Sequence, residues 1–317
     1  VRYRLPAGGG LGIRSFHDVS LEGGVGYTIN GATTMTGTTT ITSGTTVQLI
    51  SSGKINTTGD VSLLGTLDLN GSVTTSTGAF TISGAGSLTN SGGTARLALG
   101  ENLTHTGVLN LATIDLWLIG EGNQYLNPFL AKTLTVHMTG GYTSLITASS
   151  TVLGTLVNSG EGALSADDEI LTVVGTTTVG VLGVVTSTSG TIIFGDGVTS
   201  TGAIGTVNGR TRFQGAFRNE GDFRLGQGIA TTSAAFVNTG TIYGEAGALN
   251  IAPSGSSCSV LGGAGTFVPG TSTVYFYDQA GDCYLTPAFT PYYNFVLAQG
   301  DVQSYASTTV RNAFSIH

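Results

Sequence analysis

Residues Thr66 to Asn90 read TLDLNGSVTTSTGAFTISGAGSLTN, and this stretch decides the fold class. Apolar residues alternate with Thr, Ser and Asn, which is the period-two pattern of a β-strand with one buried face. Glycines interrupt the alternation at short intervals and mark turns. Frequent glycine and β-branched threonine both disfavour an α-helix. The stretch therefore predicts short strands joined by tight turns.

The composition of the whole chain agrees with an all-β protein that buries a core. The chain has 317 residues, of which 51 are Gly, and 40% of its residues are hydrophobic. Only 9% of its residues are charged, whereas an ordinary globular protein has about 25%. The polar surface must then consist mainly of Thr, Ser, Asn and Gly. Threonine fits the pleated, half-exposed face of a sheet.

The charge distribution argues against binding to nucleic acid. The net charge is −7, and contact with a phosphate backbone needs a basic stripe. The nearest feature is a group of four arginines between residues 210 and 224, which two acidic residues interrupt. We interpret these arginines as exposed side chains on strands. No run of 18 or more apolar residues occurs, so no membrane-spanning segment is expected.

The pattern of the opening stretch repeats in coils of roughly 20 residues, a period typical of solenoids. The first regular coils can be drawn at residues 27–50, 51–70, 71–91 and 92–112. A phrase ending in Asn-x-Gly recurs at Asn90, Asn158, Asn219 and Asn238; the last two copies are one coil apart, and the others are close to three coils apart. Asn tolerates the left-handed backbone and Gly supplies positive φ, so the phrase can turn a corner. We expect stacked Asn side chains to hydrogen-bond from coil to coil.

These observations predict an all-β fold, a single-stack right-handed parallel β-helix of about 15 coils with an extended N-terminal arm. Residues 1–26 would form the arm and a first atypical layer, residues 27–252 the regular solenoid, and residues 253–317 aromatic-rich C-terminal coils. Val, Ile, Leu and Phe would fill the interior, and Thr and Ser would face outward. Residues 113–138 break the rhythm, and we interpret them as a larger loop between strands at 114–119 and 133–137. Trp117 in this segment would either form a contact surface or plug the core.

A family resemblance comes from two phrases in the last third of the chain. Phe267 to Phe276 read FVPGTSTVYF, and Tyr293 to Leu297 read YNFVL. The pair resembles a pattern in very large, repetitive bacterial surface proteins, and the Thr-Gly-Thr-rich body is similar to their β-helical repeats and to autotransporter passengers. The resemblance implies a secreted or surface-displayed β-solenoid with an adhesive or structural role. It carries over no catalytic residue.

No arrangement of side chains in the sequence predicts catalysis. A glycoside hydrolase needs two carboxylates roughly 5–9.5 Å apart, and the 18 Asp and Glu residues are scattered. Asp167 and Asp168 are adjacent and would point to opposite faces of a strand. Pairs from neighbouring coils, such as Asp196 with Asp168 or Glu220 with Asp222, stay open. The histidines are isolated from each other and from the cysteines, so no zinc spacing occurs. We therefore predict no enzyme, no metal and no cofactor.

Two kinds of covalent modification have candidate residues. The interval between Cys258 and Cys283 is close to the length of one coil, and a disulfide between neighbouring coils needs Cα atoms about 5–6 Å apart. Three sequons, at Asn56, Asn70 and Asn102, are glycan acceptors if the chain is secreted by a host that glycosylates. In a chain this rich in Thr, Ser and Asn, such triplets also arise by chance.

The function predicted first is a subunit of an extracellular or cell-surface filament, sheath or layer built from copies of the chain. An exposed strand edge pairs with another strand, so the two ends of the solenoid would make the contacts. The candidate assembly residues are Val1, Arg2, Tyr3, Arg4 and Leu5 in the arm and Phe314 and Ile316 in the last strand. The arm would either add to the next subunit or pack on its own first coil. The alternatives are an adhesin or stalk that binds cell-surface or environmental glycans, and a polysaccharide-processing enzyme or phage tailspike.

Overall fold

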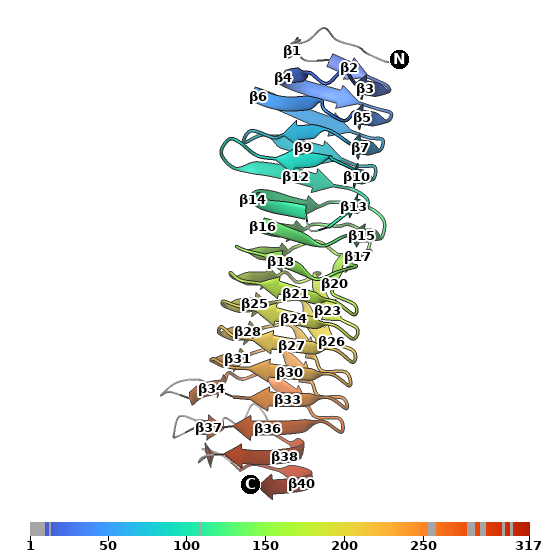
Figure 1. The fold of residues 1–317 in the computed structure, drawn as a ribbon. Coiled ribbons are helices and arrows are strands. Elements are labelled where there is room, and N and C mark those ends of the chain that lie inside the picture. The colour runs from blue at the N-terminus through green and yellow to red at the C-terminus, as the bar shows by residue number, and fades with distance from the viewer. Residues whose placement is uncertain are drawn as a thin grey trace. The chain divides into compact units, whose positions relative to one another are not determined.

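The structure is a computed structural model that describes residues 10–12, 14–107, 109–252, 258–277, 283–285, 290–299, 302–304 and 307–317. Within these residues the chain is an all-β parallel β-solenoid of about 14 turns with no helix, as the sequence predicts (Figure 1). The described residues accordingly include no helix that is long and apolar enough to cross a membrane. The arm residues Val1 to Leu5 lie outside the described residues, so the arm stays a prediction.

Contacts within the chain separate it into two units, Val1–Ala148 (unit 1) and Ser149–His317 (unit 2). A coil has three strand positions: the first two belong to one sheet, sheet A, and the third belongs to sheet B. In several coils the first two positions merge into one long strand. Figure 1 labels the strands in chain order.

In unit 1, sheet A contains β1 (Gly10–Leu11), β2 (Arg14–Phe16), β4 (Gly26–Met35), β6 (Thr46–Thr57), β8 (Thr66–Asp68), β9 (Val73–Ser76), β11 (Ser87–Thr89), β12 (Ala95–Leu99), β14 (Leu109–Leu118) and β16 (Phe129–Val136). Sheet B of unit 1 contains β3 (Val19–Leu21), β5 (Thr39–Ile41), β7 (Val61–Leu63), β10 (Phe80–Ile82), β13 (Leu103–His105), β15 (Gln124–Leu126) and β17 (Thr143–Ile146).

In unit 2, sheet A contains β18 (Ser150–Val152), β19 (Leu156–Asn158), β21 (Ile170–Val173), β22 (Thr177–Val179), β24 (Thr191–Phe194), β25 (Val198–Ser200), β27 (Arg210–Phe213), β28 (Phe217–Asn219), β30 (Ile229–Thr232), β31 (Phe236–Asn238), β33 (Ala248–Ile251), β34 (Cys258–Gly262), β36 (Thr273–Tyr277), β37 (Cys283–Leu285), β38 (Tyr292–Gln299), β39 (Val302–Ser304) and β40 (Val310–Ile316). Sheet B of unit 2 contains β20 (Ala163–Ser165), β23 (Val184–Ser187), β26 (Ala203–Thr206), β29 (Asp222–Arg224), β32 (Thr241–Tyr243) and β35 (Thr266–Val268).

The register of the strands confirms the predicted period. Leu67 pairs in parallel with Leu88, and Ile192 pairs in parallel with Thr211, so each partner lies one predicted period further along the chain. Each coil therefore lies directly on the next, and residues at equivalent positions form columns. In such a column the backbones are about 4.8 Å apart.

The core of unit 2 contains a column of phenylalanines. Phe194 stacks on Phe213 with ring centroids 5.3 Å apart, and Phe217 stacks on Phe213 at 4.0 Å and on Phe236 at 4.9 Å. Phe223 from sheet B meets Phe217 edge-on at 5.2 Å. All five rings are buried, and the burial of each contributes about 1.5–3 kcal/mol.

Hydroxyl groups also enter the interior, so the prediction that all Thr and Ser face outward is wrong. Thr57 and Ser76 are register partners on β6 and β9, and both are buried. Thr57 Oγ1 donates to Ser76 Oγ at 2.9 Å, and Ser76 Oγ donates to the Gly78 carbonyl at 3.1 Å. A short side chain beside a corner can reach a partner of this kind, which makes its burial tolerable.

Only part of the Asn-x-Gly series lies at equivalent positions. Asn219 and Asn238 are register partners at the turn from sheet A to sheet B, here called the A–B corner, and Asn219 Nδ2 donates to Asn238 Oδ1 at 2.8 Å. This contact confirms the predicted hydrogen bond between coils. Asn158 is at the same corner three coils earlier, with Val179 and Ser200 between. Asn90 instead follows β11, the first strand of its coil, so the interval from Asn90 to Asn158 does not relate equivalent positions.

Residues 113–138 belong to the solenoid, with a register shift between Leu111 and Asp115 and a longer connection between β14 and β16 that contains the short strand β15. Strand β14 pairs with β16 from Leu109 to Leu118, and β15 lies between them in the chain. Trp117 is half-buried on the outer face, where the Arg96 guanidinium lies 3.8 Å from its ring centre. Phe129, by contrast, is buried in the core. The two aromatic side chains thus have different roles, and of the two Phe129 plugs the interior.

Candidate functional site

One A–B corner of unit 1 is longer than the corners before it. Register places Leu99 and Leu118 at equivalent positions before the corner, and Leu103 and Leu126 at equivalent positions after it. Leu103 follows Leu99 by four residues, whereas Leu126 follows Leu118 by eight. Four extra residues therefore protrude from this coil. In solenoids such insertions map to one face and often form the binding surface.

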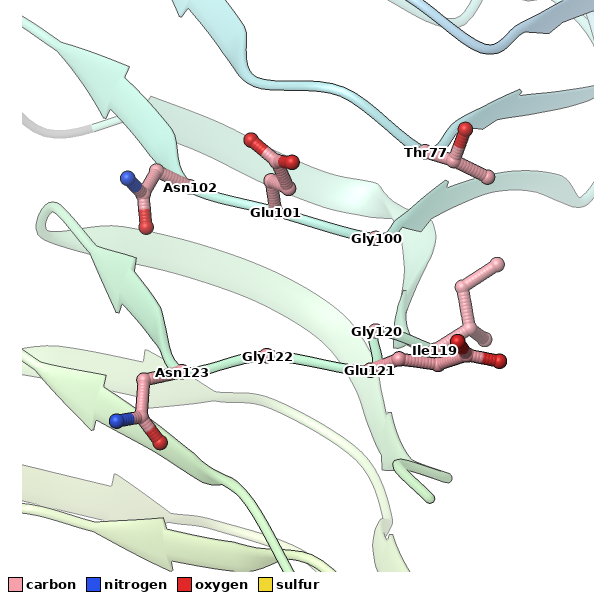
Figure 2. A pocket seen from close by; sticks show the side chains of 9 residues that line it. All are labelled: Thr77, Gly100, Glu101, Asn102, Ile119, Gly120, Glu121, Gly122 and Asn123. Carbon is pink, nitrogen blue, oxygen red and sulfur yellow. The ribbon is translucent and has the colours of Figure 1, made fainter. Parts of the chain in front are cut away.

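The longer corner borders a groove of about 500 Å³, here called the corner groove. Its lining comes from three successive coils: Thr77 of the first, residues 100–102 of the second and residues 119–123 of the third (Figure 2). Two glutamates and two asparagines contribute most of its polar side chains. The sequence did not single out this groove.

Two glycines allow the coils to approach at the base of the corner groove. A Cβ atom on Gly120 would lie 2.1 Å from the Gly100 carbonyl oxygen, so no side chain fits there. A Cβ atom on Gly122 would meet no heavy atom of the described residues within 4 Å. The corner is therefore tightly stacked at Gly120 and open at Gly122.

The asparagines of the groove hold one coil to the next. Asn102 Oδ1 accepts a hydrogen bond from the Tyr125 backbone N–H at 2.8 Å, and Asn123 Oδ1 accepts one from the Thr143 N–H at 3.0 Å. Asp60 does the same for the Ala79 N–H at 3.0 Å. These Asp and Asn side chains accept hydrogen bonds from backbone N–H groups that the turn would otherwise leave unpaired. The Nδ2 atoms of Asn102 and Asn123 donate no hydrogen bond within the described residues.

The carboxylates of the groove are not used by the fold. Glu101 and Glu121 are exposed and make no hydrogen bond or ion pair with any residue that the structure describes. Asp68 in the same unit behaves differently, since it is buried and accepts hydrogen bonds from Ser91, Gln48 and the Asn70 N–H. Burial raises the pKa of Asp68, but these hydrogen bonds outweigh it and lower the pKa below its ordinary value.

A second cavity in unit 1, of about 220 Å³, is lined by His105. The sequence analysis found this histidine isolated from the other histidines and from the cysteines. His105 ends β13, and its side chain is buried beside Leu88 and Leu109. Burial lowers the pKa of His105 and outweighs the backbone groups that would raise it. The described residues contain no group of three or more His, Cys, Asp or Glu side chains that could hold a metal ion.

Two of the carboxylates considered for catalysis, Glu220 and Asp222, pair with arginines, whereas Asp168 and Asp196 are exposed. Glu220 forms an ion pair with Arg218, and Asp222 forms one with Arg224 at 3.4 Å. Arg224 also pairs with Glu245 at 3.4 Å and lies 4.0 Å from the ring centre of Tyr243. Glu220 and Asp222 are therefore each engaged by an arginine, which gives both carboxylates a place in surface ion pairs.

The cysteines lie opposite each other on neighbouring coils. Cys258 on β34 and Cys283 on β37 are parallel register partners. Their side chains lie outside the described residues, so the disulfide stays a prediction. Adjacent parallel strands bring Cα atoms to about 4.8 Å, which is compatible with a disulfide.

The sequon asparagines lie in three different surroundings. Asn56 on β6 is exposed. Asn70 is half-buried in a turn, with φ of 43°. Asn102 is half-buried at the corner groove, and its Oδ1 is engaged by Tyr125. The structure leaves glycosylation at all three as a prediction.

Comparisons of the chain with protein-family models, curated proteins and solved structures found no match. The solenoid fold therefore rests on the chain's own strand register.

Proposed function

We propose that the protein is a subunit of an extracellular filament, sheath or surface layer in which copies contact each other end to end. The observation that supports this proposal is the surface of β40. One edge of β40 pairs with β38, where Phe314 lies opposite Phe295 and Ile316 opposite Leu297. No pairing at its other edge occurs within the described residues.

The apolar side chains of β40 continue a core column into solvent. Val274 and Phe295, the two residues before Phe314 in its column, are 0% and 4% exposed, whereas Phe314 is 57% exposed although its ring stacks on Phe295 at 5.8 Å. Ile316 is 67% exposed. Covering these two side chains with another strand would contribute about 1.5–3 kcal/mol each, in addition to the backbone hydrogen bonds of strand addition. In this proposal a second copy of the chain supplies that strand.

The composition supports an extracellular or cell-surface location, since Thr, Ser and Asn replace ions on the surface, as in the repetitive bacterial surface proteins that the sequence resembles. The proposal requires no catalytic step and no cofactor. The arm residues Val1 to Leu5 would form the complementary contact, and deletion of residues 1–10 tests that part separately.

The central test is assembly of a double variant, Phe314→Glu with Ile316→Glu. Light scattering and negative-stain microscopy should show assemblies for the unchanged chain and none for this variant, because two charges would be buried at the contact. Ser315→Glu is the matched control, since Ser315 lies between them on the opposite face of β40. It should still assemble. A monomeric unchanged chain, or normal assembly of the double variant, would refute the proposal.

A further inference from the structure

We propose that the corner groove of unit 1 binds a neutral glycan, that is, a chain of uncharged sugars. This inference is independent of the filament proposal, because the groove lies within unit 1 and does not involve β40. Four steps support it: the origin of the groove, its hydrogen-bonding groups, its charge and its neighbouring aromatic ring.

The groove borders the first of two long corners in unit 1; the next one, from Val136 to Ile146, takes ten residues. The corners from Ser76 to Phe80 and from Leu99 to Leu103 each take four residues, and they are closed by backbone contacts between coils. The corner from Leu118 to Leu126 takes eight. Extra backbone on a rigid scaffold costs conformational entropy, and such segments are where solenoids place binding residues.

The hydrogen-bonding groups of the groove suit hydroxyls. The carboxylates of Glu101 and Glu121 offer hydrogen-bond acceptors. The Nδ2 atoms of Asn102 and Asn123 offer donors. Within the described residues, none of these atoms takes part in a hydrogen bond. Figure 2 shows these four side chains on successive coils around the groove. A sugar hydroxyl both donates and accepts, so it can satisfy carboxylate and amide groups together. Hydrogen bonds to the carboxylates would be the stronger ones because they are charge-assisted.

The charge of the groove argues against anionic ligands. The described residues that line it include two carboxylates and no Lys, Arg or His, so phosphate, sulfated sugars and uronic acids would be repelled. A calcium ion would take six to eight oxygen ligands, whereas Glu101 and Glu121 are the only acidic residues in the described lining. A neutral polyol meets no such repulsion and can use both the acceptors and the donors of the groove.

An exposed aromatic residue is bonded to the groove through its backbone. The backbone N–H of Tyr125 donates to Asn102, which lines the groove, and Tyr125 is 50% exposed. A tyrosine ring is a large amphipathic surface with a polar end. In this proposal the ring covers the apolar face of a sugar whose hydroxyls reach the groove.

Affinity electrophoresis of the full chain would test the proposal, using native gels that contain hydroxyethylcellulose, laminarin or galactomannan as neutral polysaccharides and polygalacturonate as an anionic one. At least one neutral polysaccharide should retard the protein, and polygalacturonate should not. Glu101→Ala with Glu121→Ala should weaken that retardation about tenfold or more, as expected from two lost charge-assisted hydrogen bonds. Asp168→Ala with Asp196→Ala removes the same charge from exposed corners of unit 2 and should leave binding unchanged.

A second variant tests the groove by filling it. Gly122→Leu adds a side chain where the structure has open space, so it should fold, with an unchanged melting temperature, and block binding. The proposal fails if no neutral polysaccharide retards the protein, or if polygalacturonate retards it equally. It also fails if folded Gly122→Leu and the double alanine variant bind like the unchanged chain. Binding that a chelator abolishes would assign the groove to a cation instead and would also refute the proposal.

Discussion

The A–B corner is built in opposite ways in the two units. In unit 1, Asn102 lies in a four-residue corner and Asn123 in the eight-residue corner that follows, and each uses only its oxygen atom for the fold within the described residues. In unit 2 the corners from Asn219 to Phe223 and from Asn238 to Ile242 take four residues each, and both asparagines are fully buried. Asn219 Nδ2 there contacts Asn238 Oδ1, the Gly221 carbonyl and the Thr241 carbonyl.

The difference shows what the position of the asparagine decides. Asn219 and Asn238 are the last residues of strands in sheet A, where the side chain is buried and Asn219 Nδ2 can reach the next coil. Asn102 and Asn123 lie in the turn after the strand, where the side-chain oxygen accepts a backbone N–H of the next coil. The same residue type therefore uses its amide nitrogen for the stack at Asn219 and only its oxygen at the corner groove, within the described residues.

The largest effect on stability is expected in the phenylalanine column next to the short corners of unit 2. Phe217→Ala should lower the free energy of unfolding by about 3–5 kcal/mol, since it removes a buried ring and leaves a cavity. Phe217→Leu should cost less, because most of the volume remains. Urea denaturation measures both. A loss below about 1 kcal/mol for Phe217→Ala, the size of an average substitution, would mean that the short corners do not depend on the core beneath them.

The cysteine pair would add a covalent link between coils of unit 2. If Cys258 and Cys283 are bonded, the reduced protein should be about 2–4 kcal/mol less stable than the oxidised one, because the bond restricts the unfolded chain. Thiol titration under denaturing, non-reducing conditions should find no free thiol. Cys258→Ser with Cys283→Ser should match the reduced protein. Two titratable thiols in protein purified without reductant would contradict the prediction.

Asparagine substitutions compare the two corners directly. Asn219→Ala should cost about 1–3 kcal/mol, because it leaves buried carbonyl groups without their donor. Asn123→Ala should cost about 1 kcal/mol or less, because it frees one backbone N–H that solvent can reach at the open corner. Thermal unfolding of the two variants under the same conditions measures the difference between the two stability costs. Equal costs would show that burial of the amide does not distinguish the corners.

The smallest effect is a pH dependence from His105 in unit 1. Its pKa is lowered in the folded state, so between about 6.5 and the lower folded value the unfolded chain binds a proton that the folded chain does not. Stability should therefore fall as the pH drops below about 6.5, by at most about 1.4 kcal/mol per pH unit. His105→Gln should flatten this dependence between pH 7 and pH 5. His17→Gln, at an exposed position, should leave it unchanged.

The sequence predicted the features that depend on neighbours in the chain. Alternation in the stretch from Thr66 to Asn90 became β8 to β11, and the Asn-x-Gly phrase predicted the contact between Asn219 and Asn238. These features follow from side-chain period and turn chemistry alone. The inward threonines, such as Thr57, were missed because a hydroxyl near a corner can find a partner that the alternation does not reveal.

The corner groove was missed because its signal exists only relative to another coil. Four additional residues between Leu118 and Leu126 are visible only when Leu118 is known to lie opposite Leu99. The sequence showed an irregularity at residues 113–138 and predicted a larger loop between strands at 114–119 and 133–137, but it did not indicate which residues of other coils lie beside that loop. Glu101 and Glu121 belong to successive coils, and only the register brings them to one groove.

The spacing of register partners, which stays close to the predicted period in most coils, bears on how the chain folds. Each new coil forms by closing a loop of roughly 20 residues onto an existing edge, so every step costs a similar loss of chain entropy. Within a unit, folding can start at any coil and spread by nearest-neighbour contacts. A coil made early needs no residue from the far end of its unit. The chain can therefore gain structure progressively while it is still being synthesised, with each completed edge serving as the template for the next coil.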